Sequence, residues 1–491
     1  MNPAPKTAAA RPELEVKLRV PGSARVALRK AIAAQPGWSA PVVLEARYFD
    51  TPSRRLARAG MALRVRREGR RWVQVLKAAQ PGELARDEFA TLRPQGTPDL
   101  EALGSTPAAA LLRSEGEALA LRYETRVRRR TRRVRTRWGV VEIAFDEGWI
   151  GAGERRVPVL ELEFERVSGQ ARAVFELARR WMSEFGLVLD PRTKAERGDA
   201  LAEGDVDARA RRAERVTLRR SMDAHAAFRV VLHECADQIQ RNAADLALGV
   251  GGDEHVHQLR VGLRRLRTAW RLFDGECEAA PAELVDGARR LFARMGEARD
   301  AAVASSEIDP MLVAAGMPVP VPRPAPDAIP PQRWAADPGT QRWLVDLLAW
   351  IETVRAPEPG RPFASVAARR LRRWHARLVG EAAGFAQLDD ARRHDVRKRA
   401  KRLRYATEFC RALLGSKSAR AALERLALAQ QALGEVNDLV VARERHAAAV
   451  HTDPAAAWFA RGWIAARLEH AIPRARAALL ALGEARPRRG R

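Results

Sequence analysis

Acidic and basic side chains alternate with apolar ones near the start of the chain, in the stretch PELEVKLRV at residues 12–20. Alternation with a period of two is typical of a β-strand that has one apolar face. The other face of this strand carries Glu13, Glu15 and Lys17. Carboxylates beside an ammonium group fit two kinds of surface. One is the solvated outer face of a sheet, and the other is a site that binds a cation and an anion together.

Later predicted strands also alternate charged and apolar residues, and the candidate site residues on each of them carry charges of a single sign. The basic strands carry Arg64, Arg66 and Lys77, and the acidic strands carry Asp146, Glu161 and Glu163. If these faces line a barrel, two ionised carboxylates about 4 Å apart repel by about 4 kcal/mol at an effective dielectric constant of about 20, and they need a counter-cation. Carboxylate oxygens suit Mg²⁺ or Mn²⁺. Basic side chains on the opposite wall suit phosphate groups, and metal-assisted phosphoryl transfer needs this division.

A histidine-led basic pattern occurs twice in the second half of the chain. HQLRVGLRRLR starts at His257 and HDVRKRAKRLR starts at His394, and the matching stretches MGEARD and LGEVNDL follow at nearly the same offset. This recurrence indicates an internal duplication. The basic residues fall on one narrow stripe of each helix: His257, Arg260, Arg264 and Arg267, and then His394, Arg397, Lys401 and Arg404. Because like charges repel along a helix, two such stripes predict a groove for a long anion.

The composition points in the same direction. The 491 residues carry a formal net charge of +26, which favours polyanionic partners, although compositional drift towards arginine would scatter the same charge over the surface. The three cysteines are far apart and show neither metal-ligand spacing nor a disulfide framework, which suits a reducing compartment. We find no signal-peptide pattern and no membrane-spanning apolar run, so we expect a cytoplasmic protein without membrane contact.

Two kinds of element must position these side chains. Residues 11–200 show short alternating segments with turn signals, which predict an antiparallel sheet that closes into a barrel. Residues 201–214 form a polar linker, and apolar residues recur at helical spacing over residues 215–485, which predicts a helical bundle. The proline-rich segment 318–331 is expected to be an exposed, extended loop. The chain is therefore predicted to be an α+β multidomain protein.

The strand pattern resembles the CYTH family, the triphosphate tunnel metalloenzymes, whose Glu-x-Glu-x-Lys signature matches Glu13, Glu15 and Lys17. The resemblance implies an eight-stranded antiparallel tunnel over residues 11–200 that binds a linear triphosphate, with Glu13, Glu15 and Lys17 as the catalytic residues. The implied Mg²⁺ or Mn²⁺ ligands are Glu13, Glu15, Asp146, Glu161 and Glu163. The implied triphosphate-binding residues are Lys17, Arg64, Arg66, Lys77, Arg130 and Lys194, and Glu88 matches a further acid of the family. Arg130 is a choice among several arginines in RVRRRTRRVR.

The helical part resembles a CHAD domain, an all-α domain of two four-helix repeats, over residues 215–485. The resemblance implies that inorganic polyphosphate binds along the two basic stripes, with a weaker contribution from Arg369, Arg372 and Arg373. Arginine, rather than a second metal ligand, stands three residues after each leading histidine. We therefore prefer anion contact or core packing to metal binding for His257 and His394.

Together these patterns predict a metal-dependent inorganic triphosphatase that also binds polyphosphate. Three alternatives stay open: a non-catalytic protein that is targeted to polyphosphate granules, an adenylate cyclase of the class IV type that uses the same tunnel positions, and a nucleic-acid binder. No specific nucleic-acid motif supports the last. The chain length of the substrate, the preferred metal and the oligomeric state do not follow from the sequence.

Overall fold

The computed structural model describes residues 14–69, 71–79, 86–104, 106–113, 118–204, 209–303, 308–318, 329–355 and 362–487. The chain divides into two compact units. The first consists of Met1–Arg212, Ala236–Leu259 and Pro331–Val354, and the second of Ala213–Cys235, Arg260–Pro330 and Arg355–Arg491. The first unit thus joins the predicted strand region to segments of the predicted helical region.

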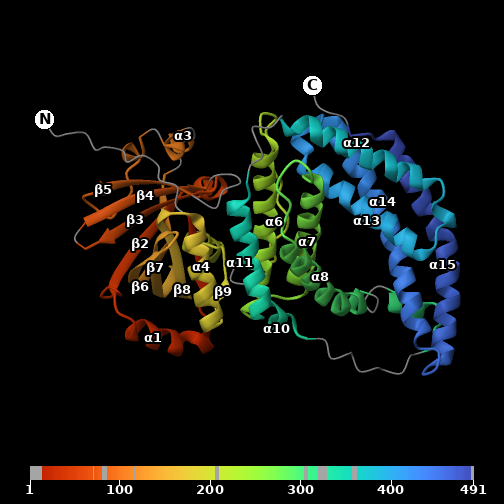
Figure 1. The fold of residues 1–491 in the computed structure, drawn as a ribbon, viewed down its shortest axis with the longest axis horizontal. Helices are drawn as coiled ribbons and strands as arrows, with labels where there is room; N and C mark the ends of the chain where they lie inside the picture. Colours follow the sequence, from red (N-terminus) through yellow and green to blue (C-terminus); the bar gives the residue numbers. More distant parts are fainter. Residues whose placement is uncertain are drawn as a thin grey trace. The chain divides into compact units, whose positions relative to one another are not determined.

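The strand region forms one antiparallel sheet (Figure 1). Its strands are β1 (Glu15–Arg19), β2 (Val42–Asp50), β3 (Met61–Glu68), β4 (Arg71–Ala79), β5 (Arg86–Arg93), β6 (Ala120–Thr136), β7 (Gly139–Ala152), β8 (Arg155–Gly169) and β9 (Val188–Leu189). The pairing order is β5-β4-β3-β2-β6-β7-β8-β1-β9. The predicted antiparallel sheet is confirmed, and the two-residue β9 adds a ninth strand to the eight expected ones. Closure of the sheet into a tunnel stays a prediction.

Short helices accompany the strands. They are α1 (Arg25–Ala34), α2 (Arg55–Arg58), α3 (Pro107–Arg113), α4 (Ala171–Phe185) and α5 (Lys194–Ala202). Helix α4 packs its buried side chains, among them Phe175 and Trp181, against β1, β7 and β8. It ends at Gly186, whose φ of +61° places it in the left-handed conformation that glycine adopts at low cost. This layer covers the apolar face of the acidic strands, so their charged side chains must point to the opposite face.

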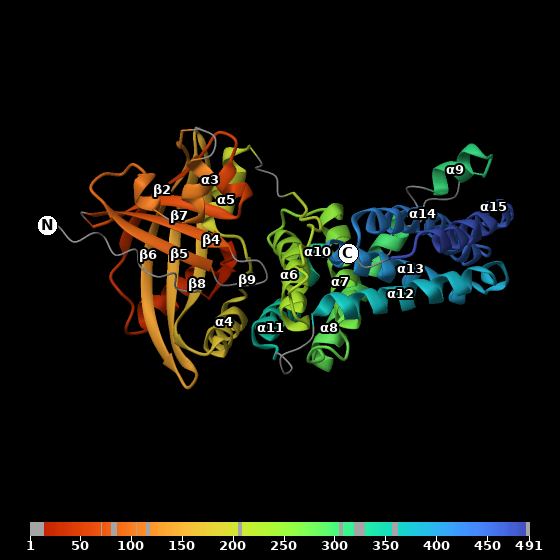
Figure 2. The same ribbon diagram turned by 90° about the horizontal axis from the view of Figure 1, so that it is seen from above.

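The remaining chain is helical, as the spacing of apolar residues predicts (Figure 2). Its helices are α6 (Ala224–Ala247), α7 (Asp253–Leu272), α8 (Ala282–Val303), α9 (Asp309–Ala314), α10 (Pro331–Ala335), α11 (Pro338–Thr353), α12 (Phe363–Ala382), α13 (Asp390–Phe409), α14 (Ser416–Ala447) and α15 (Pro454–Leu480). Helices α12 to α15 pack on one another as a four-helix group. The duplication into two such groups stays a prediction. None of the described helices combines the length and the apolar character needed to cross a membrane.

Two predicted boundaries can be compared with the described helices. Helix α5 extends to Ala202, two residues into the predicted linker 201–214, and α6 begins at Ala224. Most of the predicted proline-rich loop, residues 319–328, lies outside the described residues. Its last residue, Pro331, already begins α10, because a proline at the first helical position lacks only an N–H group that no helical carbonyl would accept.

Candidate active site

The strand register brings most of the predicted site residues to one face of the sheet. Residues directly opposite each other in antiparallel strands point to the same face. Lys17 on β1 lies opposite Glu163 on β8, and Glu161 on β8 lies opposite Asp146 on β7. Asp146 in turn lies opposite Arg129 on β6. We call this side of the sheet the charged face.

The prediction of Arg130 is corrected by this register. Arg130 lies opposite Phe145, whose side chain is buried on the other side of the sheet, and its Nε donates a hydrogen bond to the carbonyl oxygen of Ser39 at 3.1 Å. The neighbouring Arg129, opposite Asp146, is the arginine of this stretch that contacts the acidic residues of β7 and β8 on the charged face. The sequence could not separate the two, because RVRRRTRRVR places arginines on both faces of the strand.

Three buried carboxylates form the acidic centre of the charged face. Asp146, Glu161 and Glu163 are 0%, 1% and 7% exposed, and one oxygen from each lies within 4.8 Å of the others. Lys194, the first residue of α5, reaches all three. Its Nζ lies 2.7 Å from Asp146 and 2.7 Å from Glu163, and it also pairs with Glu161. The structure therefore gathers four predicted residues at one point.

Two arginines complete the acidic centre. Arg129 makes a bidentate contact with Asp146, Nε donating at 2.7 Å and Nη2 at 2.6 Å, and it also pairs with Glu163. Arg197 donates to Glu161 at 2.8 Å from one turn after Lys194 on α5. Sequence analysis missed both arginines. A helix that begins at Lys194 places residue 197 on the same side, so the spacing within TKAER was the available signal.

Burial and charge act in opposite directions on the pKa values of this centre. Burial alone would raise the pKa of Glu163, but Lys194, Arg129 and Lys17 hold it well below its ordinary value. Burial would lower the pKa of Lys194, and the three carboxylates, led by Asp146, hold it well above its ordinary value. Glu163 and Lys194 are therefore both ionised at neutral pH, and their charges are paired.

The basic wall lies on β3 and β4 and faces the same side. Arg64 and Arg66 lie opposite Tyr48 and Ala46 on β2, and Lys77 lies opposite Glu88 on β5, with Nζ 3.2 Å from the Glu88 carboxylate. The Nε–H of Arg64 is buried and has no hydrogen-bond acceptor among the described residues. A buried donor without an acceptor is costly, and a phosphate oxygen would satisfy it.

The opening signature is described in part. Glu13 lies outside the described residues. Glu15 and Lys17 lie on the charged face and pair with each other. Lys17 also contributes to the lowered pKa of Glu163, so the charged side chains of β1 lie close to the acidic centre.

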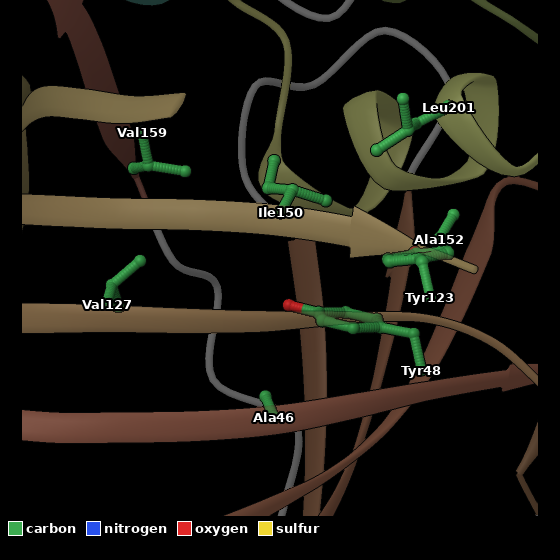
Figure 3. Close-up of a cluster of buried hydrophobic side chains, with 8 residues drawn as sticks. All are labelled: Ala46, Tyr48, Tyr123, Val127, Ile150, Ala152, Val159 and Leu201. Atoms are coloured by element: carbon green, nitrogen blue, oxygen red, sulfur yellow. The ribbon is translucent and has the colours of Figure 1, made fainter. Parts of the chain in front are cut away.

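An apolar cluster occupies the same face of the sheet next to the acidic centre (Figure 3). Tyr48 and Tyr123 stack with ring centroids 4.6 Å apart, and Leu201 of α5 packs onto the same cluster as Ile150 and Val159. The N-terminal end of α5 thus supplies cations to the carboxylates, while its C-terminal end packs against the apolar cluster. Buried apolar side chains therefore lie next to the acidic centre on this face, and electrostatic interactions are stronger in apolar surroundings.

The carboxylate set fits a hard divalent cation. Asp146, Glu161 and Glu163 offer oxygen atoms only, at mutual distances that one ion can bridge. The Lys194 ammonium group lies among the same oxygens, so the site already attracts a positive charge.

Basic residues of both predicted stripes converge in the second compact unit. Arg260 is buried, donates to the carbonyl oxygen of Met295 at 2.6 Å and lies 5.0 Å from the ring centroid of Phe292. The pKa of Lys401 is lowered to about 7, first by burial and then by Arg397, Arg264 and Arg260. The contributions to Lys401 show that residues of α7 and α13 face a common space. We call Arg260, Arg264, Arg397 and Lys401 the basic cluster.

Two other predicted stripe residues, His394 and Arg404, have local partners. Nδ1 of His394 lies 2.7 Å from the Asn437 side-chain oxygen, and Arg404 contacts Glu408 at 2.9 Å and Gln430 at 3.0 Å. Arg267 has a lowered pKa because of burial and of Arg271 and Arg289. His257 lies on α7 and is half-buried. Arg369, Arg372 and Arg373 are exposed on α12.

Two family models match this sequence. The CYTH domain matches residues 11–198 and the CHAD domain matches residues 230–447. The first match contains the whole charged face, and the second contains the basic cluster.

Individual proteins are also similar. An inorganic triphosphatase from Haemophilus influenzae is 30% identical over 161 residues, which are 31% of this chain and 44% of that protein, so the chain spans less than half of this curated relative. The crystal structure of the CHAD domain from the plant Ricinus communis is 31% identical and covers 57% of this chain and 99% of its own, with a TM-score of 0.49. The structure of a putative adenylyl cyclase from Hippeastrum, described as having a dominant triphosphatase activity, is 20% identical. The match covers 39% of this chain and 96% of that chain, with a TM-score of 0.29.

Proposed function

We propose that this chain, which belongs to the CYTH family through residues 11–198 and to the CHAD family through residues 230–447, hydrolyses inorganic triphosphate on the charged face and binds inorganic polyphosphate at the basic cluster. The activity depends on Mg²⁺ or Mn²⁺. The single observation that carries the proposal is the division of charge on one face of the sheet. Three buried carboxylates gather on β7 and β8, and Arg64, Arg66 and Lys77 lie on β3 and β4.

Each part of this face has a task in hydrolysis. Asp146, Glu161 and Glu163 would hold the metal, and the bound ion supplies polarisation of a phosphoryl oxygen. Arg64 and Arg66 bind the phosphate oxygens, and the buried Nε–H of Arg64 gains an acceptor when they do. Lys17 lies on β1 opposite Glu163 of the acidic centre and neutralises charge on the phosphoryl group. No side chain in this set is proposed as a covalent nucleophile, so water attacks the terminal phosphorus directly.

The helical domain binds a longer anion by charge. The four members of the basic cluster come from two helices, so a flexible chain of phosphates can contact both. The pKa of Lys401 is lowered first by burial and then by the neighbouring cations, and a polyanion relieves the repulsion between those cations. Such binding would also bring the protein to polyphosphate granules.

A panel of substrates tests the catalytic proposal. Phosphate release is measured with triphosphate, ATP, thiamine triphosphate and long polyphosphate, each with Mg²⁺ or Mn²⁺. We expect release from triphosphate that stops with EDTA and in the Glu161→Gln variant. Metal-independent binding without turnover would instead identify a polyphosphate-binding protein, and formation of cyclic AMP from ATP would identify a cyclase.

A further inference from the structure

Helix α5, which carries Lys194 and Arg197, is held at its N-terminus by a residue of α6. The two carboxylate oxygens of Glu196 have different partners. Oε2 accepts hydrogen bonds from the backbone N–H of Thr193 at 2.8 Å and from its hydroxyl at 2.9 Å. Oε1 accepts a hydrogen bond from the Arg241 guanidinium at 2.7 Å. The residue that closes the capping box of α5 is therefore also bound by α6.

Arg241 is itself fixed in place. Its Nε donates to Asp237 at 2.6 Å, and Asp237 also accepts a hydrogen bond from Arg211 at 2.8 Å. Burial alone would lower the pKa of Arg241, but Glu196 and Asp237 raise it above its ordinary value. Arg241 is thus a permanent cation in a charge-assisted network, which is a rigid support for the end of a short helix.

A second contact fixes the segment just before α5. Arg192 donates to Asp190 at 2.8 Å, and its Nη2 lies 2.8 Å from Asp245 near the end of α6. Both acids are buried, being 1% and 2% exposed. The backbone N–H of Asp190 donates to the carbonyl oxygen of Lys17 at 3.2 Å, which links this segment to β1. All these residues belong to the first compact unit.

We infer that Arg241 and Asp245 are positioning residues for the two cations of α5. Lys194 and Arg197 are three residues apart, so they lie on one side of the helix, and both contact Glu161. A frayed first turn or a small rotation of α5 would withdraw both cations together. Arg241 and Asp245 fall within the match to the CHAD domain, whereas the carboxylates fall within the match to the CYTH domain. The helical region therefore completes the acidic centre of the sheet.

The chain offers a matched control. Arg179 on α4 pairs with Asp346 on α11, which also joins the sheet region to a helix of the helical region within the first unit. Among the described residues, neither member of this pair has a hydrogen bond or ion pair with α5. Arg179→Ala therefore removes an ion pair of the same kind while it leaves the support of α5 intact.

Hydrogen exchange of the backbone amides at residues 190–202 tests the inference directly. We expect Arg241→Ala to speed exchange in this segment by about tenfold and to leave β7 and β8 unchanged, because the charge-assisted hydrogen bond to Glu196 is lost at α5 and the other hydrogen bond of Arg241, to Asp237, lies within α6. Arg241→Lys should restore part of the protection, and Arg179→Ala should not alter this segment. Unchanged exchange at residues 190–202 in Arg241→Ala, or faster exchange throughout the sheet, would overturn the inference.

The catalytic consequence rests on the proposed function and has its own readout. If triphosphate is the substrate, Arg241→Ala lowers kcat for phosphate release by about tenfold, since a misplaced cation is costly in a preorganised site. Absence of phosphate release from the wild-type chain would remove the proposed function. The positioning role would then still be decided by the hydrogen-exchange measurement.

Discussion

The ammonium nitrogen of Lys194 lies 2.7 Å from Oδ2 of Asp146, whose side chain is fully buried. Arg129 contacts the same carboxylate through two hydrogen bonds. The three acids Asp146, Glu161 and Glu163 are thus met by the three cations Lys194, Arg129 and Arg197. Buried charges are tolerated only when they are paired in this way. A divalent cation must therefore compete with Lys194 for the same oxygens.

Removal of one carboxylate should weaken metal binding at the acidic centre. We expect Glu161→Gln to lower the affinity for Mn²⁺ by at least about tenfold, because one of three oxygen ligands loses its charge. Isothermal titration with Mn²⁺ measures this effect. Glu45→Gln is the matched control, since Glu45 lies on the opposite face of the sheet and pairs with Arg126. Equal Mn²⁺ affinity in the wild type and Glu161→Gln would contradict the metal assignment.

Two adjacent arginines on β6 should behave differently. Arg129→Ala leaves the buried carboxylates of Asp146 and Glu163 short of a partner, so we expect the free energy of unfolding to fall by about 3–5 kcal/mol. Arg130→Ala removes one hydrogen bond to Ser39, and we expect a loss of about 1 kcal/mol. Urea unfolding of both variants measures the difference. A larger loss for Arg130→Ala would show that the strand register has been misread.

The acidic centre should give the stability of the protein a broad plateau in pH. The pKa of Glu163 is lowered by folding, so its stabilisation is present above its unfolded pKa of about 4.3 and is lost as the pH falls through the folded value. The pKa of Lys194 is raised, so its stabilisation is present below its unfolded pKa of about 10.4 and is lost as the pH rises through the folded value.

Urea midpoints measured across the pH range test this plateau with the Lys194→Met variant. The variant should lose the alkaline decline that Lys194 causes. Its acid decline should begin at a higher pH, because Lys194 is the largest of the attractive contributions that lower the pKa of Glu163. If the two proteins show the same pH profile, Lys194 and Glu163 are not coupled.

Much of this arrangement could be predicted from the sequence, since an alternating strand places its charged residues on one face. That pattern indicated Asp146, Glu161, Glu163 and Arg64 correctly as residues of a common face. The choice between Arg129 and Arg130 failed, because it depends on the exact register between β6 and β7. The contacts of Arg241 with α5 join residues distant in the chain, and no local spacing indicates them.

The basic cluster should bind polyphosphate more weakly as the pH rises through 7. Burial and the neighbouring arginines lower the pKa of Lys401 to about 7, so this side chain loses its charge near neutral pH in the free protein. A bound polyanion favours the charged form, and binding should therefore take up a proton near pH 7–8. Titration with long polyphosphate at pH 6 and pH 8, in buffers of different ionisation enthalpy, measures both effects.

A neighbouring lysine provides the control for this pH dependence. Lys398 lies on the same helix and pairs with Asp395 at 3.2 Å on an exposed surface. Lys401→Met should reduce the difference in affinity between pH 6 and pH 8, whereas Lys398→Met should preserve it. A pH dependence that persists in Lys401→Met would assign the titrating group elsewhere.

Substitution of Gly198 should disturb the acidic centre from a distance. A Cβ atom at this position of α5 would lie 2.1 Å from Cδ2 of Tyr123, which is buried and stacked on Tyr48. Although alanine favours a helix by up to about 1 kcal/mol, overpacking costs about 1–3 kcal/mol, so we expect Gly198→Ala to lower the free energy of unfolding. The displaced helix also carries Lys194, and phosphate release should fall with it. Gly380→Ala is the control, because its Cβ atom meets nothing within 4 Å on α12, and it should be neutral or stabilising. Wild-type stability and activity in Gly198→Ala would show that α5 does not need its close contact with the Tyr123 ring.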